Sequence, residues 1–130
     1  MSGFVGLVPA VRIRLSNLPL KAEYPSDASV EAVVDTGYEG FIAVPREVFA
    51  ALRLDEMVAG QRTVEVADGR KVRSRVAYAT VAVEGADREI DGAVETMDGL
   101  TEILIGARLL SEFRLMLDYC LGVVSVIPCR

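Results

Sequence analysis

The tripeptide Asp35-Thr36-Gly37 holds the residue types of a hydrolytic centre, and it directly follows the apolar run 32–34. A carboxylate at the end of a buried strand costs free energy unless it is hydrogen-bonded. Thr36 offers a neighbouring hydroxyl, and Gly37 lets backbone N–H groups approach closely. The tripeptide alone is equally compatible with a strand-end turn in which Asp35 hydrogen-bonds its own backbone.

The composition removes most other routes to hydrolysis. The 130 residues include no histidine, so neither a Ser-His-Asp nor a Cys-His arrangement can be assembled. Two cysteines without histidine do not make a zinc site, and the chain has no glycine-rich phosphate loop. Carboxylate chemistry is the remaining familiar route, and we predict no metal and no cofactor.

The charge and hydropathy of the chain restrict its partners. A net charge of -5 argues against nucleic acid as the main partner, because phosphate binding needs a basic surface. The basic residues of 70–75 alternate with valines, which is typical of a solvated strand face. The hydrophobic fraction of 52% is high for a small protein. A buried subunit interface or a core rich in valine and alanine would each account for it.

Targeting features are not evident in the sequence. The segment Met1–Val11 is apolar but lacks a basic n-region and is interrupted by Pro9, so we do not interpret it as a signal peptide. No apolar run approaches the ~18 residues that span a membrane. The two cysteines do not suggest a disulfide framework, so we expect a cytoplasmic protein.

Alternating apolar and polar residues predict many short strands. The predicted strands are Val11–Leu15, Val30–Val34, Phe41–Val44, Thr63–Val66, Val72–Val83, Ile90–Val94, Ile103–Ile105, Arg114–Leu117 and Val123–Ile127. Short helices are predicted at Pro45–Leu54 and Ala107–Phe113, and Ser16–Ser29 reads as a loop. Asp68-Gly69 between apolar runs predicts a hairpin turn. The pattern indicates a mostly β fold, a small barrel or sandwich.

The order of these elements resembles the retropepsin-like aspartic peptidases, especially the small single-domain members of bacteria and archaea. The resemblance extends from Val11 to Ile127 and is most specific at Val33–Pro45 and Glu102–Asp118. It implies one domain over residues 1–130, folded as a small closed β-barrel with one or two short helices. It also implies that the strand-to-helix element Leu104-Ile105-Gly106 packs behind the catalytic loop.

The resemblance assigns roles to individual residues. Asp35 matches the catalytic aspartate, Thr36 matches the residue whose hydroxyl ties two catalytic loops across a dimer axis, and Gly37 matches the glycine beside the substrate backbone. The hairpin tip Ala67-Asp68-Gly69 falls where the family has its flap, although an ordinary surface hairpin would look the same. The implied substrate groove is formed by Tyr38, Glu39, Ile42, Val66 and Leu104.

Three departures from the family pattern concern the groove and the interface. Tyr38 replaces the small residue that often follows Asp-Thr-Gly, and Gly40 adds flexibility or length to the same loop. In the segment Gly106-Ala107-Arg108 the arginine that supports the dimer in viral members is displaced or missing.

The aspartic mechanism requires two carboxylates that share one proton. The chain has one Asp-Thr-Gly, so the second carboxylate must come from Asp35 of another copy in a homodimer. The expected protein is an aspartic endopeptidase that cuts extended peptide or protein substrates between apolar residues. Two alternatives stay open: a non-catalytic peptide-binding or assembly module on the same fold, and an unrelated β-barrel that binds a small apolar ligand or serves in assembly.

Overall fold

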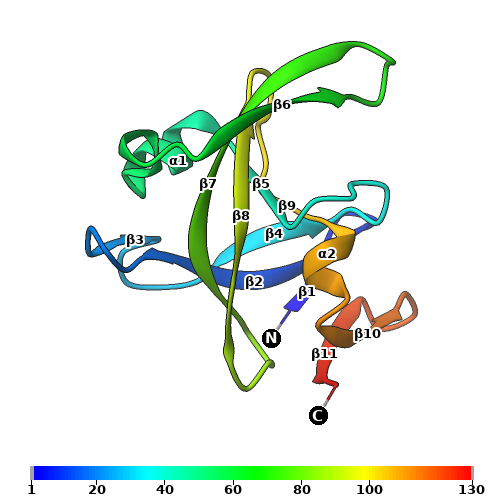
Figure 1. Cartoon of the computed structure of the whole chain (residues 1–130). Helices are drawn as coiled ribbons and strands as arrows, with labels where there is room; N and C mark the ends of the chain where they lie inside the picture. The colour runs from blue at the N-terminus through cyan, green and yellow to red at the C-terminus, as the bar shows by residue number, and fades with distance from the viewer. Residues whose placement is uncertain (1, 130) are drawn as a thin grey trace.

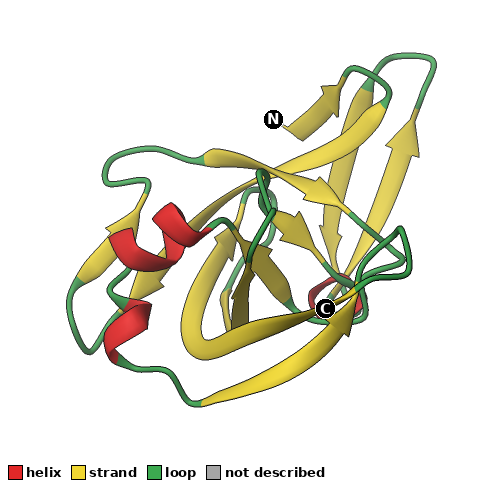
Figure 2. Ribbon diagram, turned by 90° about the horizontal axis from the view of Figure 1, so that it is seen from above, coloured by secondary structure: helices red, strands yellow, loops and turns green. Residues whose placement is uncertain are grey.

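The structure is a computed structural model that describes residues 2–129, and it is mostly β (Figures 1 and 2). Its strands are β1 (Ser2–Val5), β2 (Val8–Asn17), β3 (Ala22–Tyr24), β4 (Val30–Val34), β5 (Ile42–Val44), β6 (Gly60–Glu65), β7 (Lys71–Val83), β8 (Glu89–Met97), β9 (Leu104–Ile105), β10 (Phe113–Asp118) and β11 (Val123–Pro128). Its helices within this range are α1 (Arg46–Ala51), α2 (Ala107–Leu110) and the 3-10 helix η1 (Leu54–Glu56).

All the strands belong to one hydrogen-bonded sheet, in the order β10-β11-β1-β2-β4-β9-β5-β8-β7-β6, with β3 paired to β2. The sheet bends back on itself, because β2 also pairs with β7 from Ile13↔Val83 to Ser16↔Thr80. Six strands (β2, β4, β9, β5, β8 and β7) therefore form a continuous circuit of pairings. The long strands β7 and β8 stand upright in Figure 1, and the upper end of β7 forms a hairpin with β6.

The core follows from the alternation that the sequence shows. On β2 the side chains of Val11, Ile13 and Leu15 are buried, whereas Arg12 and Arg14 point outward. The helix α1 adds Val48 and Phe49 to the same buried cluster. Because the alternate residues of a strand face opposite sides, one side of the sheet becomes the interior.

The predicted elements are largely confirmed, but two strands were missed and both predicted helices end early. The helix predicted over Ala107–Phe113 stops at Leu110, and Phe113 already begins β10. The strands β1 and β3 were not predicted, and β3 lies inside the segment 16–29 that the sequence marked as a loop. The predicted helix Pro45–Leu54 stops at Ala51, because Arg53 adopts a left-handed conformation with φ 57° before η1 begins. The hairpin around Asp68 forms as predicted, and Gly69 provides the positive φ of 86° that its turn requires.

The two segments that carried the resemblance lie side by side. Strand β4 runs parallel to β9 in the register Val33↔Leu104 and Val34↔Ile105, and β5 pairs with the other edge of β9. The loop 35–41 therefore leaves the sheet next to the start of α2. Among residues 2–129, no helix has the length and apolarity that crossing a bilayer would require.

Candidate active site

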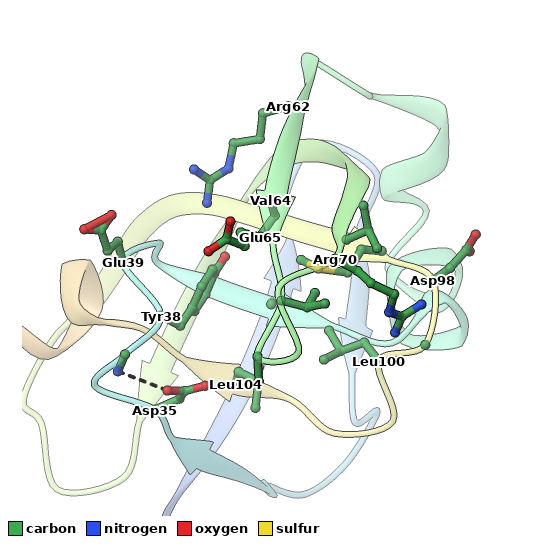
Figure 3. Close-up of a pocket in the computed structure, with 17 residues that line it drawn as sticks. Asp35, Tyr38, Glu39, Arg62, Val64, Glu65, Arg70, Asp98, Leu100 and Leu104 are labelled. Carbon is green, nitrogen blue, oxygen red and sulfur yellow. Dashed lines mark hydrogen bonds between the residues drawn. The ribbon is translucent and has the colours of Figure 1, made fainter.

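Asp35 is held at the end of β4 by two backbone hydrogen bonds. Its own N–H donates to the carbonyl of Ile105 at 2.9 Å, and the N–H of Gly37 donates to Asp35 Oδ1 at 3.0 Å (Figure 3). Within residues 2–129, Oδ2 of Asp35 has no hydrogen-bond partner. The side chain is half-buried, whereas Thr36 is exposed. One carboxylate oxygen is therefore fixed and the other is open to a ligand.

The strand-to-helix element 104–108 lies directly behind this loop, as the resemblance implied. Gly106 N–H donates to Phe41 O at 3.0 Å, Ala107 N–H to Tyr38 O at 2.8 Å, and Arg108 N–H to Gly40 O at 3.1 Å. A Cβ at position 106 would overlap the carbonyl oxygen of Gly40. The close approach of two backbones thus explains the glycine at this position.

The position of the Tyr38 ring accounts for the glycine at position 40. A Cβ at Gly40 would lie 2.5 Å from Cζ of the Tyr38 ring, and a Cβ at Gly106 would lie 2.6 Å from its Cδ2. The ring of Tyr38 therefore occupies the space that two glycines leave free. Besides the flexibility or length that the sequence suggested for this loop, Gly40 makes room for its neighbour's side chain.

A buried carboxylate that sequence reasoning missed lies beneath Tyr38. Glu95 of β8 is 3% exposed. Its Oε1 accepts from the hydroxyl of Tyr38 and from Arg62 Nη2 at 2.6 Å, and its Oε2 accepts from Arg62 Nε at 2.5 Å and Ser74 Oγ at 2.7 Å. The available signal was a single acid in the otherwise uncharged run 93–97. A charge in such a run needs partners.

These contacts set the protonation states of the network. Burial alone would raise the pKa of Glu95, but hydrogen bonds from Arg62, Tyr38 and Ser74 outweigh it and hold that pKa below its ordinary value. Burial, followed by the hydrogen bond to Glu95, raises the pKa of Tyr38. The hydrogen bond to Glu95 raises the pKa of Arg62. At neutral pH the network therefore joins a charged ion pair to a neutral phenol.

The lowered pKa of Glu95 predicts stability that is sensitive to acid. Its contribution is fully present above the unfolded-state pKa of glutamate and is lost as the pH falls through the lower folded-state pKa. Urea unfolding between about pH 6 and pH 3 should therefore show a steeper loss of unfolding free energy in wild type than in Glu95→Gln. Equal slopes for the two proteins would contradict this assignment.

Asp35 lines a pocket of about 700 Å³ beneath the β6–β7 hairpin (Figure 3). The pocket is lined by Asp35, Gly37, Tyr38, Glu39, Ala43, Arg62, Val64, Glu65, Val66, Ala67, Arg70, Val72, Met97, Asp98, Gly99, Leu100 and Leu104. Apolar side chains from the hairpin line it together with Leu100 and Leu104. Arg62 and Arg70 lie toward different ends, so the groove is more charged than the sequence suggested.

The pocket brings together most, but not all, of the predicted site. Asp35, Gly37, Tyr38, Glu39, Val66, Ala67 and Leu104 line it. Ile42 does not, because its side chain packs in the buried core cluster. Ala43, the next residue on β5, faces the opposite side of the strand and lines the pocket instead. Thr36, Asp68 and Gly69 are exposed outside the pocket, the last two at the hairpin tip, where Asp68 pairs with Arg70.

Known proteins show the same fold. No family model matches the chain. An uncharacterized protein of Archaeoglobus fulgidus is 40% identical over 126 residues, which cover 97% of this chain and 98% of that protein. The EIAV protease in complex with the inhibitor HBY-793 superimposes with a TM-score of 0.56 at 14% identity, covering 80% of this chain and 86% of the protease. The retroviral protease-like domain of Ddi1 from Leishmania major gives 0.54 at 17% identity, with 92% of each chain covered.

Proposed function

Since this chain belongs to one family with the uncharacterized Archaeoglobus fulgidus protein and has a retropepsin-like fold, we propose that it is an aspartic endopeptidase that acts as a homodimer. One observation carries the proposal. Asp35 sits on a pocket with Oδ1 held by the Gly37 N–H, while its second oxygen is open. An acid fixed in this way is suited to hold a water together with a second acid.

The chemistry requires Asp35 from both copies. Two carboxylates that meet over one water cannot both ionise, so they share a proton. The ionised Asp35 takes a proton from the water as the water attacks the scissile carbonyl carbon, and the protonated Asp35 donates to the carbonyl oxygen. Collapse of the tetrahedral intermediate breaks the C–N bond once the amine is protonated. The apparent pKa values belong to the pair.

The surface of the molecule supports a second copy. Exposed apolar side chains occur on the turn between β1 and β2 and on the β10–β11 hairpin, which β1 joins in the sheet, and we name them together the terminal apolar surface. Its members are Val5, Leu7, Val8, Met116, Leu117, Tyr119, Leu121 and Ile127. Leu7 is 86% and Leu121 75% exposed, which is costly for a lone subunit. Strand β10 also ends the sheet order, so its outer edge is open to pairing.

Breaking the terminal apolar surface should therefore abolish both assembly and activity. We expect Leu121→Asp to convert the dimer into a monomer in light scattering, because the variant places a charge where apolar groups meet. Cleavage should disappear together with the dimer. Leu18→Asp is the matched control, since Leu18 is 62% exposed and lies outside this surface. A Leu121→Asp variant that remains a fully active dimer would disprove the assigned interface.

The hairpin over the pocket would act as the flap that closes on substrate. An extended peptide would lie between the hairpin and the Asp35 loop, held by main-chain hydrogen bonds in the manner of an added strand. The apolar walls Val66 and Leu104 favour cleavage between apolar residues. Under the same proposal the six-strand circuit is a small closed β-barrel, residues 1–130 are one domain, and the protein works in the cytoplasm without nucleic-acid or membrane partners.

The test is cleavage of an unfolded protein, scanned between about pH 4 and pH 7 because the reaction needs one ionised and one protonated carboxyl group. Wild type, wild type with pepstatin, and Asp35→Asn are compared after each is shown to be folded. The competing function is a non-catalytic peptide-binding module, which is favoured by the bulky Tyr38 beside Asp35 in the pocket. In that case wild type and Asp35→Asn would bind the peptide alike and neither would cut it.

A further inference from the structure

The strand β6 is weakly attached to the rest of the molecule. It ends the sheet order, pairs with β7 alone, and exposes most of its side chains. Within residues 2–129, its side-chain hydrogen bonds to elements other than β7 all come from Arg62, and they all reach Glu95. The side chain of Arg62 is 49% exposed, whereas that of Glu95 is 4% exposed. Apart from its backbone ladder with β7, a single side-chain ion pair therefore ties this edge strand to the body.

The same carboxylate also fixes the loop that carries Asp35. Glu95 accepts a hydrogen bond from the Tyr38 hydroxyl, and Tyr38 is bound to Asp35 through its own N–H, which donates to Asp35 O at 3.2 Å. Ser74 of β7 supplies a further hydrogen bond to Glu95. One buried acid thus collects donors from the flap strand, from its partner strand and from the Asp35 loop.

The geometry of the donors makes the arrangement specific. Arg62 presents two N–H groups to the two carboxylate oxygens, a fork that fixes direction as well as distance. Glu95 is shielded from water, so the loss of Arg62 removes the only cation that its buried carboxylate contacts among the described residues. Both Arg62 and Tyr38 line the pocket, so their positions set its width (Figure 3).

We propose that Glu95 is a latch that holds the β6–β7 hairpin, through Arg62, and the Asp35 loop, through Tyr38, in a fixed relative position across the pocket. Arg62, Tyr38 and Glu95 are then positioning residues for the peptide that binds between hairpin and loop. The inference rests on the proposed function in taking the hairpin as the flap.

The two halves of the latch differ in how they open. The Arg62 side chain is half-exposed, so water can replace Glu95 as the partner of its guanidinium. The contacts of Tyr38 and Ser74 are more deeply buried and remain in place. Arg62 pairs with Ser74 in the β6–β7 register, so the part of the hairpin beyond that pair, residues 63–73, is the part that moves.

The test is hydrogen–deuterium exchange on the full chain without substrate. In Arg62→Gln and Glu95→Gln, the β6–β7 amides of residues 63–73 should exchange about tenfold faster or more than in wild type, because local opening has lost its main restraint. Arg73→Gln is the matched control, since its hydrogen bond to Gln61 stays within the hairpin. Tyr38→Phe should leave hairpin exchange unchanged and accelerate exchange in the loop 35–41.

Kinetics add a readout that a purely structural role would not produce. Arg62→Gln should raise KM with little change in kcat, and Arg62→Lys should restore part of the loss because it keeps the charge but not the fork. Tyr38→Phe should lower kcat instead, because it frees the loop that holds Asp35. If Glu95→Gln fails to fold, the Arg62→Gln and Arg62→Lys variants still test the latch.

The outcomes separate the latch from the proposed function. Faster hairpin exchange in Arg62→Gln but not in Arg73→Gln supports the latch even when wild type cleaves nothing, in which case the proposed function alone fails. Equal exchange in these two variants overturns the latch, and active wild type would then leave the peptidase proposal standing.

Discussion

Asp35→Asn is expected to lower the rate of peptide cleavage by at least about 10²–10⁴-fold, the usual contribution of a positioned acid or base. The amide of asparagine keeps the shape of the side chain and can still accept the hydrogen bond from Gly37. The fold and the dimer should therefore survive, while the shared proton and the general base are lost. Initial rates on an unfolded protein substrate measure the effect, and Asp55→Asn, an exposed aspartate of η1, is the control.

Dimers that mix wild-type and Asp35→Asn chains test the same prediction more strictly. When wild type and Asp35→Asn chains exchange subunits freely, a dimer with one asparagine has one acid and should be inactive. Activity should then follow the square of the wild-type fraction, so an equal mixture retains about one quarter of the rate. A linear dependence, which leaves about half, would mean that each chain works alone and would refute the shared centre.

Gly106→Ala is expected to destabilise the protein by about 2 kcal/mol or more, because overpacking of this kind forces the backbone to move. The new methyl group would overlap the carbonyl of Gly40 and lie 2.6 Å from the ring of Tyr38. Three hydrogen bonds join this segment to the loop of Asp35, so the loop must shift with it. Urea unfolding measures the loss of stability, and cleavage should fall in the same variant.

Gly60→Ala is the matched control for this substitution. A Cβ at Gly60 would meet nothing within 4 Å, so the same chemical change should leave both stability and cleavage close to wild type. The two backbones behind Asp35 would not be in tight contact if Gly106→Ala proved as stable as Gly60→Ala.

The strands of the fold were predictable because alternation is a local signal. The strand β4 has the predicted bounds, whereas β2 and β8 extend beyond their predicted cores at both ends, by one to three residues. The strand β3 escaped prediction because its three residues stand among prolines and serines that mark a turn. The helix α1 ends early because one residue, Arg53, adopts a positive φ. The sequence did not predict this end, because arginine is not a helix-breaking residue.

The candidate site was predictable only where one stretch of sequence carries it. Asp35 was found from its tripeptide, whereas Ile42 was assigned to the wrong face because 41–44 is uniformly apolar and gives no periodicity. Arg62 and Glu95 are 33 positions apart in the sequence. They meet only through the registers of β6 with β7 and of β7 with β8, and no local sequence pattern around either residue reveals that meeting.

The packing of Tyr38 against Gly40 and Gly106 bears on how this family can evolve. The three positions share one small volume, and an added carbon at either glycine overlaps the ring of Tyr38. A homologue with alanine at position 38 would free the space above position 40, and a side chain could enter there. These sites should therefore covary, with an aromatic residue at 38 inherited together with its glycines.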